Sequence, residues 1–153
     1  MFRYKRFVVN PIEENCYIIW DDISREGAII DCGTWSKGEN NSIATFIRDN
    51  NISLKYALQT HMHFDHCLGL GQIASCYGLT PMCHPADVPV YEGAPDMVQK
   101  WFRVDISDML QELGFNVVGE GADGFDAIEL CRSKHPNIAL MDIKMPIFDG
   151  LTA

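Results

Sequence analysis

The chain has 153 residues, of which 47% are hydrophobic and 22% are charged. This composition is that of a folded globular protein rather than a disordered or fibrous one, and the length suits one average domain or two small ones. A net charge of −9 argues against nucleic acid or an anionic membrane as a partner, because both need a basic surface. No apolar run approaches the roughly 18 residues of a membrane span, and the first ten residues lack the apolar region of a signal peptide. We therefore expect a cytoplasmic protein.

The six cysteines do not form the paired pattern of a structural zinc site. They are even in number, but none is part of a Cys-x-x-Cys motif. Structural zinc sites normally use such pairs, and disulfides need an oxidising compartment. We interpret most of the cysteines as small buried hydrophobic residues in a reducing environment.

The first hundred residues predict short strands interrupted by two helices. Strands are expected at residues 6–9, 16–20, 28–31 and 56–59, and the polar stretch 21–27 suits a hairpin between the second and the third. A first helix is indicated by the spacing of Ile43, Phe46 and Ile47. Its cap is expected at Asn40, Asn41 or Ser42, and its end at Asn50 and Asn51. A second helix is expected from about Asp65 to just before Gly78.

From residue 102 onward the pattern becomes strictly alternating helix and strand. Helical spacing of Val104, Met109, Leu110 and Leu113 is followed by a strand at 115–118. A helix containing Phe125, Ile128 and Leu130 stops before His135, and an apolar strand follows at 138–141. This order is typical of a doubly wound α/β fold. We expect an α/β protein, partly α+β, in two parts at residues 1–101 and 102–153.

Residues 60–66, Thr-His-Met-His-Phe-Asp-His, are the strongest candidate for a metal site. Imidazole nitrogen and carboxylate oxygen are ligands that zinc favours, and a loop can bring such side chains together. In an extended stretch His61 and His63 point the same way and can share one ion, while Asp65 and His66 can bind a second. Two ions would stabilise a bridging hydroxide as nucleophile. The alternatives are a histidine-rich surface loop and a metal-poor remnant of a site.

This motif resembles that of the metallo-β-lactamase superfamily, and most closely its glyoxalase II-like hydrolases. Asn15-Cys-Tyr17 and Ile29-Ile-Asp-Cys-Gly33 are similar to the early strands of that family. The resemblance implies an αββα sandwich, here truncated. It also implies that His61 and His63 bind the first metal ion, that Asp65 and His66 bind the second, and that Asp65 orients the attacking water. Asp31 would have a structural or supporting role and no catalytic one.

The resemblance also implies ligands that this chain does not match. Family members supply a third histidine for the first ion, a bridging aspartate and a last histidine for the second, all beyond the matched stretch. We expect one or two Zn2+ ions, held weakly if there is only one. The implied activity is hydrolysis of a small-molecule thioester, ester or lactone, impaired by the missing ligands. His84 is a poor substitute, expected to be partly buried at a strand end, and His135 is expected at a solvated helix end.

A second resemblance covers nearly all of residues 103–153. Asp142 follows the strand at 138–141, the position at which open α/β sheets bind ligands, although it could equally be a turn residue. With Asp105–Leu110, Phe115–Gly119, Ala122–Gly124 and Ala127–Leu130, the stretch resembles a response-regulator receiver domain. Asp142 would then accept phosphate from a histidine kinase, and the Lys144 backbone carbonyl would bind Mg2+. The acidic pair and first strand of a receiver have no counterpart here.

The two resemblances together predict a chimera of a metallohydrolase part and a receiver part. Three functions are left open: a zinc-dependent hydrolase, a receiver module phosphorylated on Asp142, and a protein that is non-functional or completed by a partner. Unpaired strand edges are an aggregation hazard, so self-association through the truncated edges is expected.

Overall fold

A computed structural model describes residues 1–106 and 124–134 of the chain. The chain divides into two compact units, Met1–Asn116 and Val117–Ala153, each of which is considered by itself. No helix within those described ranges is both long and apolar enough to cross a membrane.

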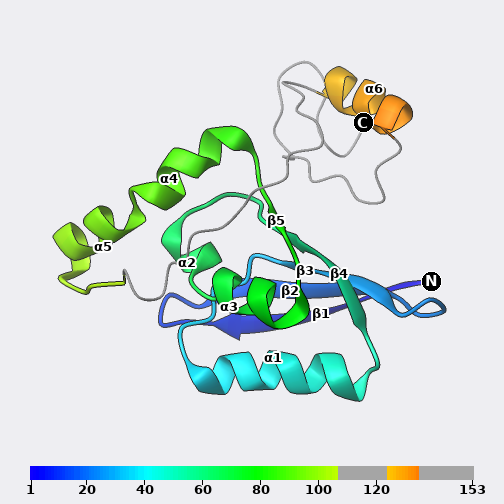
Figure 1. Cartoon of the computed structure of the whole chain (residues 1–153), viewed down its shortest axis with the longest axis horizontal. Coiled ribbons are helices and arrows are strands. Elements are labelled where there is room, and N and C mark those ends of the chain that lie inside the picture. Colours follow the sequence, from blue (N-terminus) through cyan, green and yellow to red (C-terminus); the bar gives the residue numbers. More distant parts are fainter. Residues whose placement is uncertain (107–123, 135–153) are drawn as a thin grey trace. The chain divides into compact units, whose positions relative to one another are not determined.

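The first unit is built on a five-stranded sheet with the strands in chain order (Figure 1). The strands are β1 (Phe2–Val9), β2 (Glu14–Asp21), β3 (Glu26–Ile30), β4 (Ser53–Leu58) and β5 (Pro81–Met82). β1, β2 and β3 pair antiparallel, whereas β3, β4 and β5 pair parallel. The carboxyl ends of β3, β4 and β5 therefore meet the amino end of β2 at one edge of the sheet, and the segments that leave this edge carry the candidate site.

The predicted strands at 6–9, 16–20, 28–31 and 56–59 are confirmed, with bounds that differ by a few residues. In β2 every second side chain is buried, from Glu14 through Cys16 and Ile18 to Trp20. β1 begins earlier than the predicted strand, at Phe2. Its first half is exposed on both faces, and Phe2 and Tyr4 are 74% and 73% accessible. Such a strand has no alternation of buried and exposed residues from which its start could be predicted.

Helix α1 (Lys37–Asp49) begins earlier than predicted. Its N-cap is Ser36, whose hydroxyl accepts from the Glu39 backbone N–H while the Glu39 carboxylate accepts from the Ser36 N–H at 2.7 Å. This reciprocal capping box satisfies two backbone donors, so the prediction of a cap at Asn40–Ser42 was wrong. The predicted end is confirmed, since Asn50 is the C-cap.

The main core lies between the sheet and helices α1 and α3 (Leu70–Tyr77). Ile43 and Ile47 of α1 are buried against strand residues, and the Phe46 ring meets Phe7 and Trp20 edge-on, each at 5.6 Å between centroids. Of the cysteines that the structure describes, Cys16, Cys32, Cys67 and Cys83 are buried and Cys76 is exposed, and all five are free. The interpretation of most cysteines as buried hydrophobic residues is confirmed for these four.

The single helix predicted from Asp65 to Gly78 is two helices, α2 (Phe64–Cys67) and α3. The chain breaks at Gly69, where a Cβ atom would lie 1.8 Å from Thr34 Oγ1. The Gly69 N–H donates to Cys32 O at 2.9 Å instead of continuing the helix. Gly78 ends α3 with a left-handed φ of 63°, as predicted.

Three further helical segments follow β5: a 3-10 turn η1 (Pro85–Asp87), α4 (Val88–Glu92) and α5 (Ala94–Phe102). A second, smaller core joins α5 to α2 through residues Phe64, Leu68, Ala94, Val98 and Ile106. The helical stripe predicted from Val104 is wrong at its start, because Val104 lies outside any helix and is 37% exposed. The rest of that stripe lies outside the described residues.

In the second unit the structure describes helix α6 (Gly124–Lys134). It confirms the helix predicted around Ile128 and Leu130, whose predicted end before His135 falls at the limit of the described residues. The strands predicted at 115–118 and 138–141 lie outside the described residues.

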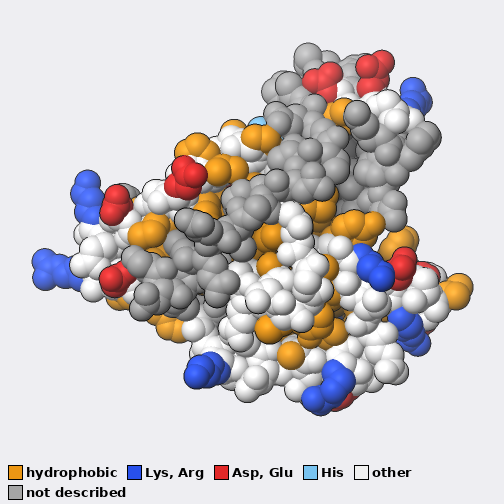
Figure 2. Space-filling model, in the orientation of Figure 1, with side chains coloured by type: hydrophobic (Ala, Val, Ile, Leu, Met, Phe, Trp, Pro, Cys, Tyr) orange, Lys and Arg blue, Asp and Glu red, His pale blue; other side chains and the backbone are white. Residues whose placement is uncertain are grey.

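Apolar side chains also reach the surface of the described part, at Met1, Ile12, Ile23 and Phe102 as well as on β1. Figure 2 shows hydrophobic side chains exposed at several places on one face, with Lys and Arg residues around them. The expectation of self-association stays a prediction.

Candidate metal centre

The histidine loop leaves the carboxyl end of β4 and runs into α2. It brings three imidazoles together, with the ring centroids of His61 and His63 4.5 Å apart and those of His61 and His66 4.0 Å apart. Asp65 Oδ2 lies 3.7 Å from His66 Nε2. His63 is exposed, and His61, Asp65 and His66 are half-buried. The four side chains predicted as metal ligands thus form one cluster that solvent can reach.

Asp31 supports this loop from the end of β3. It is buried and has a left-handed φ of 51°, which Asp tolerates better than most residues. Its carboxylate accepts hydrogen bonds from Thr60 N at 2.8 Å and Thr60 Oγ1 at 2.6 Å. Asp31 Oδ2 also lies 3.2 Å from His66 Nδ1. Asp31 therefore fixes both the start of the loop and one of its imidazoles.

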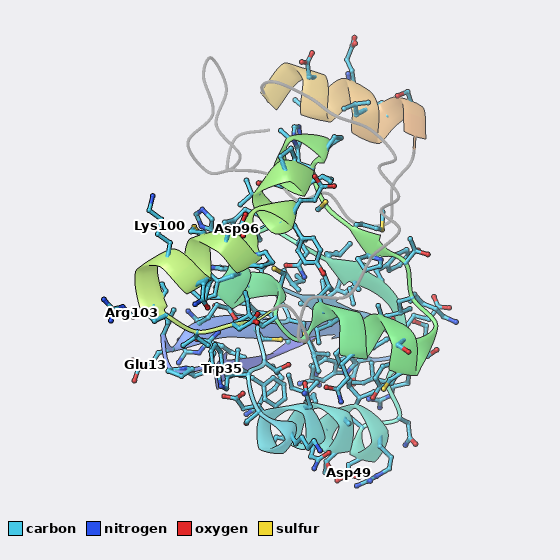
Figure 3. All side chains as sticks on the ribbon, turned by 60° about the vertical axis from the view of Figure 1, so that its left-hand side comes forward. Glu13, Trp35, Asp49, Asp96, Lys100 and Arg103 are labelled. Carbon is cyan, nitrogen blue, oxygen red and sulfur yellow. The ribbon has the colours of Figure 1, made fainter. Side chains whose placement is uncertain are left out.

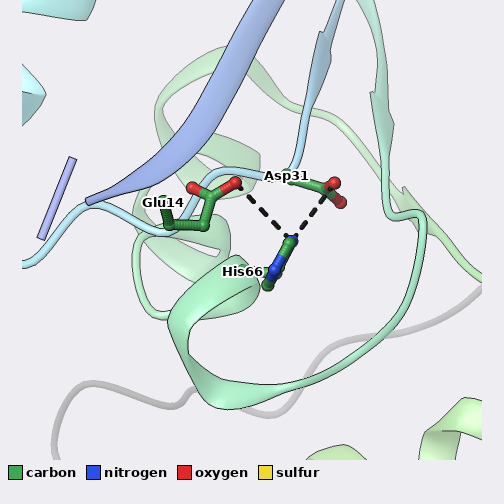
Figure 4. Close-up of side chains that lie close together, drawn as sticks. All are labelled: Glu14, Asp31 and His66. Carbon is green, nitrogen blue, oxygen red and sulfur yellow. Dashed lines mark ion pairs between the residues drawn. The ribbon is translucent and has the colours of Figure 1, made fainter. Parts of the chain in front are cut away.

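Glu14, at the start of β2, approaches the same imidazole from the other side (Figure 4). Its side chain is 3% exposed, and its Oε1 lies 3.5 Å from His66 Nδ1. Within the described part of the chain, Glu14, Asp31 and His66 are the one group whose potential ligand atoms all lie within 4.8 Å of one another. Glu14 Oε2 and His66 Nδ1 are buried there without a hydrogen-bond partner. The three residues form a candidate cation site.

Hydrogen bonding favours a supporting role for Asp31. Both oxygens of Asp31 already accept from Thr60, so few of their lone pairs are free for a cation. A carboxylate behind the inner nitrogen of a histidine fixes the ring and its tautomer while the outer nitrogen binds metal. The outer nitrogen of His66, Nε2, lies 3.7 Å from Asp65 Oδ2, so these two atoms are close enough to bind the same ion. The nitrogen and oxygen donors of the loop fit a zinc ion.

The pKa values of His61 and His66 are shifted in opposite directions. Burial, together with the neighbouring His66 and His63, lowers the pKa of His61, which favours the neutral form that binds metal. Burial also lowers the pKa of His66, but Asp31, Glu14 and Asp65 outweigh it, so the net shift is upward. Burial raises the pKa of Glu14 from 4.5 to about 8, against the opposing charge of His66.

The raised pKa of Glu14 predicts a pH-dependent stability in metal-free protein. The folded state holds this proton up to about pH 8, whereas the unfolded state releases it near 4.5. The contribution is therefore complete below the unfolded pKa and is lost as the pH rises through the folded one. The urea midpoint should fall between about pH 5 and about pH 8, and Glu14→Gln should make that decline shallower. His66 contributes in the same direction, so part of the slope should persist.

The exposed neighbour Glu13 offers a matched control. Glu13→Gln should leave the pH dependence of the urea midpoint as in the wild type. Equal slopes for Glu14→Gln and wild type would contradict the assignment of a protonated Glu14.

Of the remaining predicted residues, only His84 lies within the described part of the chain. His84 was expected to be partly buried, but it is exposed, and its Nδ1 accepts from Ala86 N at 3.2 Å at the start of η1. His84 Nδ1 therefore acts as the N-cap of this turn. His135, Asp142 and Lys144 lie outside the described residues.

Sequence reasoning missed Glu14. The signal that could have found it is an acidic residue at an inward position of an alternating strand, in register with Cys16, Ile18 and Trp20. A charged residue at such a position is rarely buried unless it is paired.

The fold and the histidine loop define a class, and the comparisons with known proteins agree. The sequence model of the metallo-beta-lactamase superfamily matches residues 9–136, which is most of the chain. The chain belongs to this superfamily.

Among its relatives is hydroxyacylglutathione hydrolase GloC of Haemophilus influenzae, 31% identical over 121 residues. This match covers 77% of the chain and 55% of GloC, so the chain spans about half the length of that relative. Crystal structures of BLEG-1 B3 metallo-beta-lactamase and of TTHA1623 in a di-iron-bound form share the fold. BLEG-1 gives a TM-score of 0.66 at 17% identity, covering 79% of the chain and 55% of the BLEG-1 chain. TTHA1623 gives a TM-score of 0.62 at 24% identity, covering 76% of the chain and 55% of the TTHA1623 chain.

A different stretch of the chain resembles receiver proteins. Over 51 residues it is 45% identical to transcriptional regulatory protein PdtaR of Mycobacterium tuberculosis, a match covering 33% of the chain and 25% of PdtaR. The chain thus combines a metallo-beta-lactamase domain with a separate, partial receiver match, which agrees with the predicted chimera.

Proposed function

We propose that this chain carries the metal site of a zinc-dependent hydrolase acting on a thioester, ester or lactone. The observation that supports this proposal most strongly is the packing of three imidazoles and Asp65 at the carboxyl end of β4, with His66 supported by two buried carboxyl groups. The named activity of GloC favours a thioester of a glutathione-like thiol among these substrates.

Each residue has a distinct role in this proposal. His61 and His63 would hold one zinc ion, and Asp65 and His66 a second. Bound zinc would lower the pKa of a coordinated water and polarise the carbonyl of the substrate. Asp65 would orient the attacking water, and Asp31 and Glu14 would keep the His66 ring in place.

We also propose that turnover by this 153-residue chain alone is low. Catalytic zinc sites normally have three protein ligands. The loop offers two imidazoles to the first ion, and the Nδ1 atom of His84, a further histidine that the structure describes, is engaged by Ala86 N. A weakly held ion is present for a small fraction of the time at ordinary zinc concentrations.

Hydrolysis of a hydroxyacylglutathione thioester by the zinc-loaded chain tests the proposal. We expect a measurable release of thiol that chelator abolishes and zinc restores, with kcat/KM below about 10⁴ M⁻¹ s⁻¹, the lower end for enzymes. Asp65→Asn should lower the rate by about 100-fold or more, because positioned proton acceptors contribute at least that much. Asp49→Asn, at the exposed end of α1, is the control. A rate equal to that without protein for thioester, ester and lactone alike would refute the hydrolase.

The receiver function stays a prediction. The similarity to PdtaR favours it, and Asp142 and Lys144 would be its phosphoacceptor and magnesium-binding backbone.

A further inference from the structure

Asn10 occupies a buried position between three segments that meet beside the histidine loop. It follows β1 with a left-handed φ of 56°, which asparagine adopts more readily than most residues, and it is 9% exposed. Its Nδ2 donates to Gly33 O at 2.9 Å and to Asp65 O at 2.8 Å. These bonds join residues 23 and 55 positions apart in the sequence.

The other polar groups of Asn10 are also engaged. Oδ1 accepts from Ile12 N at 2.9 Å, and the backbone N–H donates to Glu39 Oε1 at 2.7 Å. The amide orientation follows from this network, because the opposite orientation would place Oδ1 against two carbonyl oxygens. Asn10 thus ties the β1–β2 turn to the capping box of α1 and to both loops of the site. Figure 3 shows Glu13 and Trp35, from the turn and from the loop after β3, at the same end of the sheet.

The hydrogen bond from Asn10 to Asp65 O takes the place of a helical hydrogen bond that is missing here. In a continuing α-helix the N–H of residue 69 would donate to the carbonyl of residue 65. Here the Gly69 N–H donates to Cys32 O at 2.9 Å. The carbonyl of Asp65 therefore depends on the Asn10 side chain, and a part-buried carbonyl that loses its donor is costly.

The backbone of Asp65 packs closely against Gly33 at the point where Asn10 bonds to it. A Cβ atom on Gly33 would lie 1.7 Å from Asp65 O, so the two backbones are in direct contact. Asn10 Nδ2 donates to the carbonyl oxygens of both Gly33 and Asp65 and so holds the two backbones together.

We propose that Asn10 is a positioning residue for the metal site: it fixes the backbone of Asp65 and thereby the binding of the second ion, while the first ion at His61 and His63 is left largely unaffected. This inference rests on the proposed function, because it assigns Asp65 to the second ion. It adds a residue that touches neither metal nor substrate.

The test uses two substitutions that keep the left-handed backbone. Asn10→Asp retains the shape and the acceptor but removes the donor, and Asn10→Gly removes the side chain. Asn50→Asp is the matched control, since Asn50 Nδ2 donates to Phe46 O at 2.9 Å at the far end of α1. Zinc titration should show the second binding step weakened by about 10- to 100-fold in both Asn10 variants, with the first step and the Asn50 variant near wild type.

Hydrogen exchange on metal-free protein provides a readout independent of zinc. The amides of residues 64–69 should exchange about 10-fold faster in the Asn10 variants and at the wild-type rate in Asn50→Asp. If wild type binds no zinc but the exchange result holds, the hydrolase proposal fails while the placement of Asp65 by Asn10 stands. Unchanged exchange at 64–69, or two zinc steps weakened equally, would overturn the role of Asn10.

Discussion

Replacing His61 and His63 together by alanine is expected to weaken zinc binding by about 100-fold or more. Loss of a group that merely supports a ligand costs 10- to 100-fold in metal affinity, so the loss of two imidazole ligands should cost at least as much. The rings of His61 and His63 lie 4.5 Å apart between centroids, close enough for both to reach one ion. Competition with a chromophoric chelator measures the affinity directly.

His84→Ala is the control for this experiment. His84 is an exposed imidazole on the same unit, at the end of β5. Its replacement should leave the zinc affinity unchanged. Superimposable titrations of wild type and the double variant would show that the loop does not bind zinc through these residues.

Gly33→Ala is expected to lower the free energy of unfolding by about 3 kcal/mol or more, at the upper end for overpacking. The added Cβ would lie 1.7 Å from Asp65 O and 2.8 Å from Asp65 C, both backbone atoms, and 3.0 Å from Glu14 Oε2. Backbone atoms cannot rotate away as the end of a flexible side chain can. The loop after β3 and the start of α2 must therefore separate, which should weaken zinc binding as well.

Gly38→Ala offers a matched comparison in urea unfolding. Its nearest heavy atom is Ser36 Oγ at 3.8 Å, an ordinary contact, and it lies in the first turn of α1. Alanine is favoured over glycine in helices by up to about 1 kcal/mol, so this variant should be as stable as wild type or more so. Equal urea midpoints for Gly33→Ala and wild type would contradict the close contact of the two loops.

Much of the sheet could be predicted from the sequence because its strands are either alternating or mostly apolar. β2 has a buried residue at every second position, and β3 and β4 are mostly apolar. The exposed start of β1 could not be predicted, since nothing selects an alternating pattern on a strand exposed on both faces. α1 was placed from its apolar spacing, but its true cap depends on the pairing of Ser36 with Glu39.

The break between α2 and α3 depended on a tertiary contact. Leu68 and Gly69 fit a continuous helix locally. At the break the Gly69 N–H donates to Cys32 O, and Thr34 packs so closely that only glycine fits. Contacts between residues from distant segments cannot be predicted from the local sequence for the same reason.

The candidate site shows the same division. His61, His63, Asp65 and His66 lie within six residues, so local spacing was enough to group them. Glu14 and Asn10 reach the loop from β2 and from the end of β1, and only the register of the folded sheet places them there. The supporting role of Asp31 was inferred from the family resemblance. The contacts of Asp31 with Thr60 and His66 are those that such a role requires.

Anomalous scattering at the zinc edge, from crystals of the zinc-loaded chain, tests the central claim most directly. The account predicts a zinc ion about 2.0–2.1 Å from a ring nitrogen of both His61 and His63. A zinc ion bound instead through His66 Nδ1 between Glu14 and Asp31, or no zinc within bonding distance of the histidine loop, would contradict it.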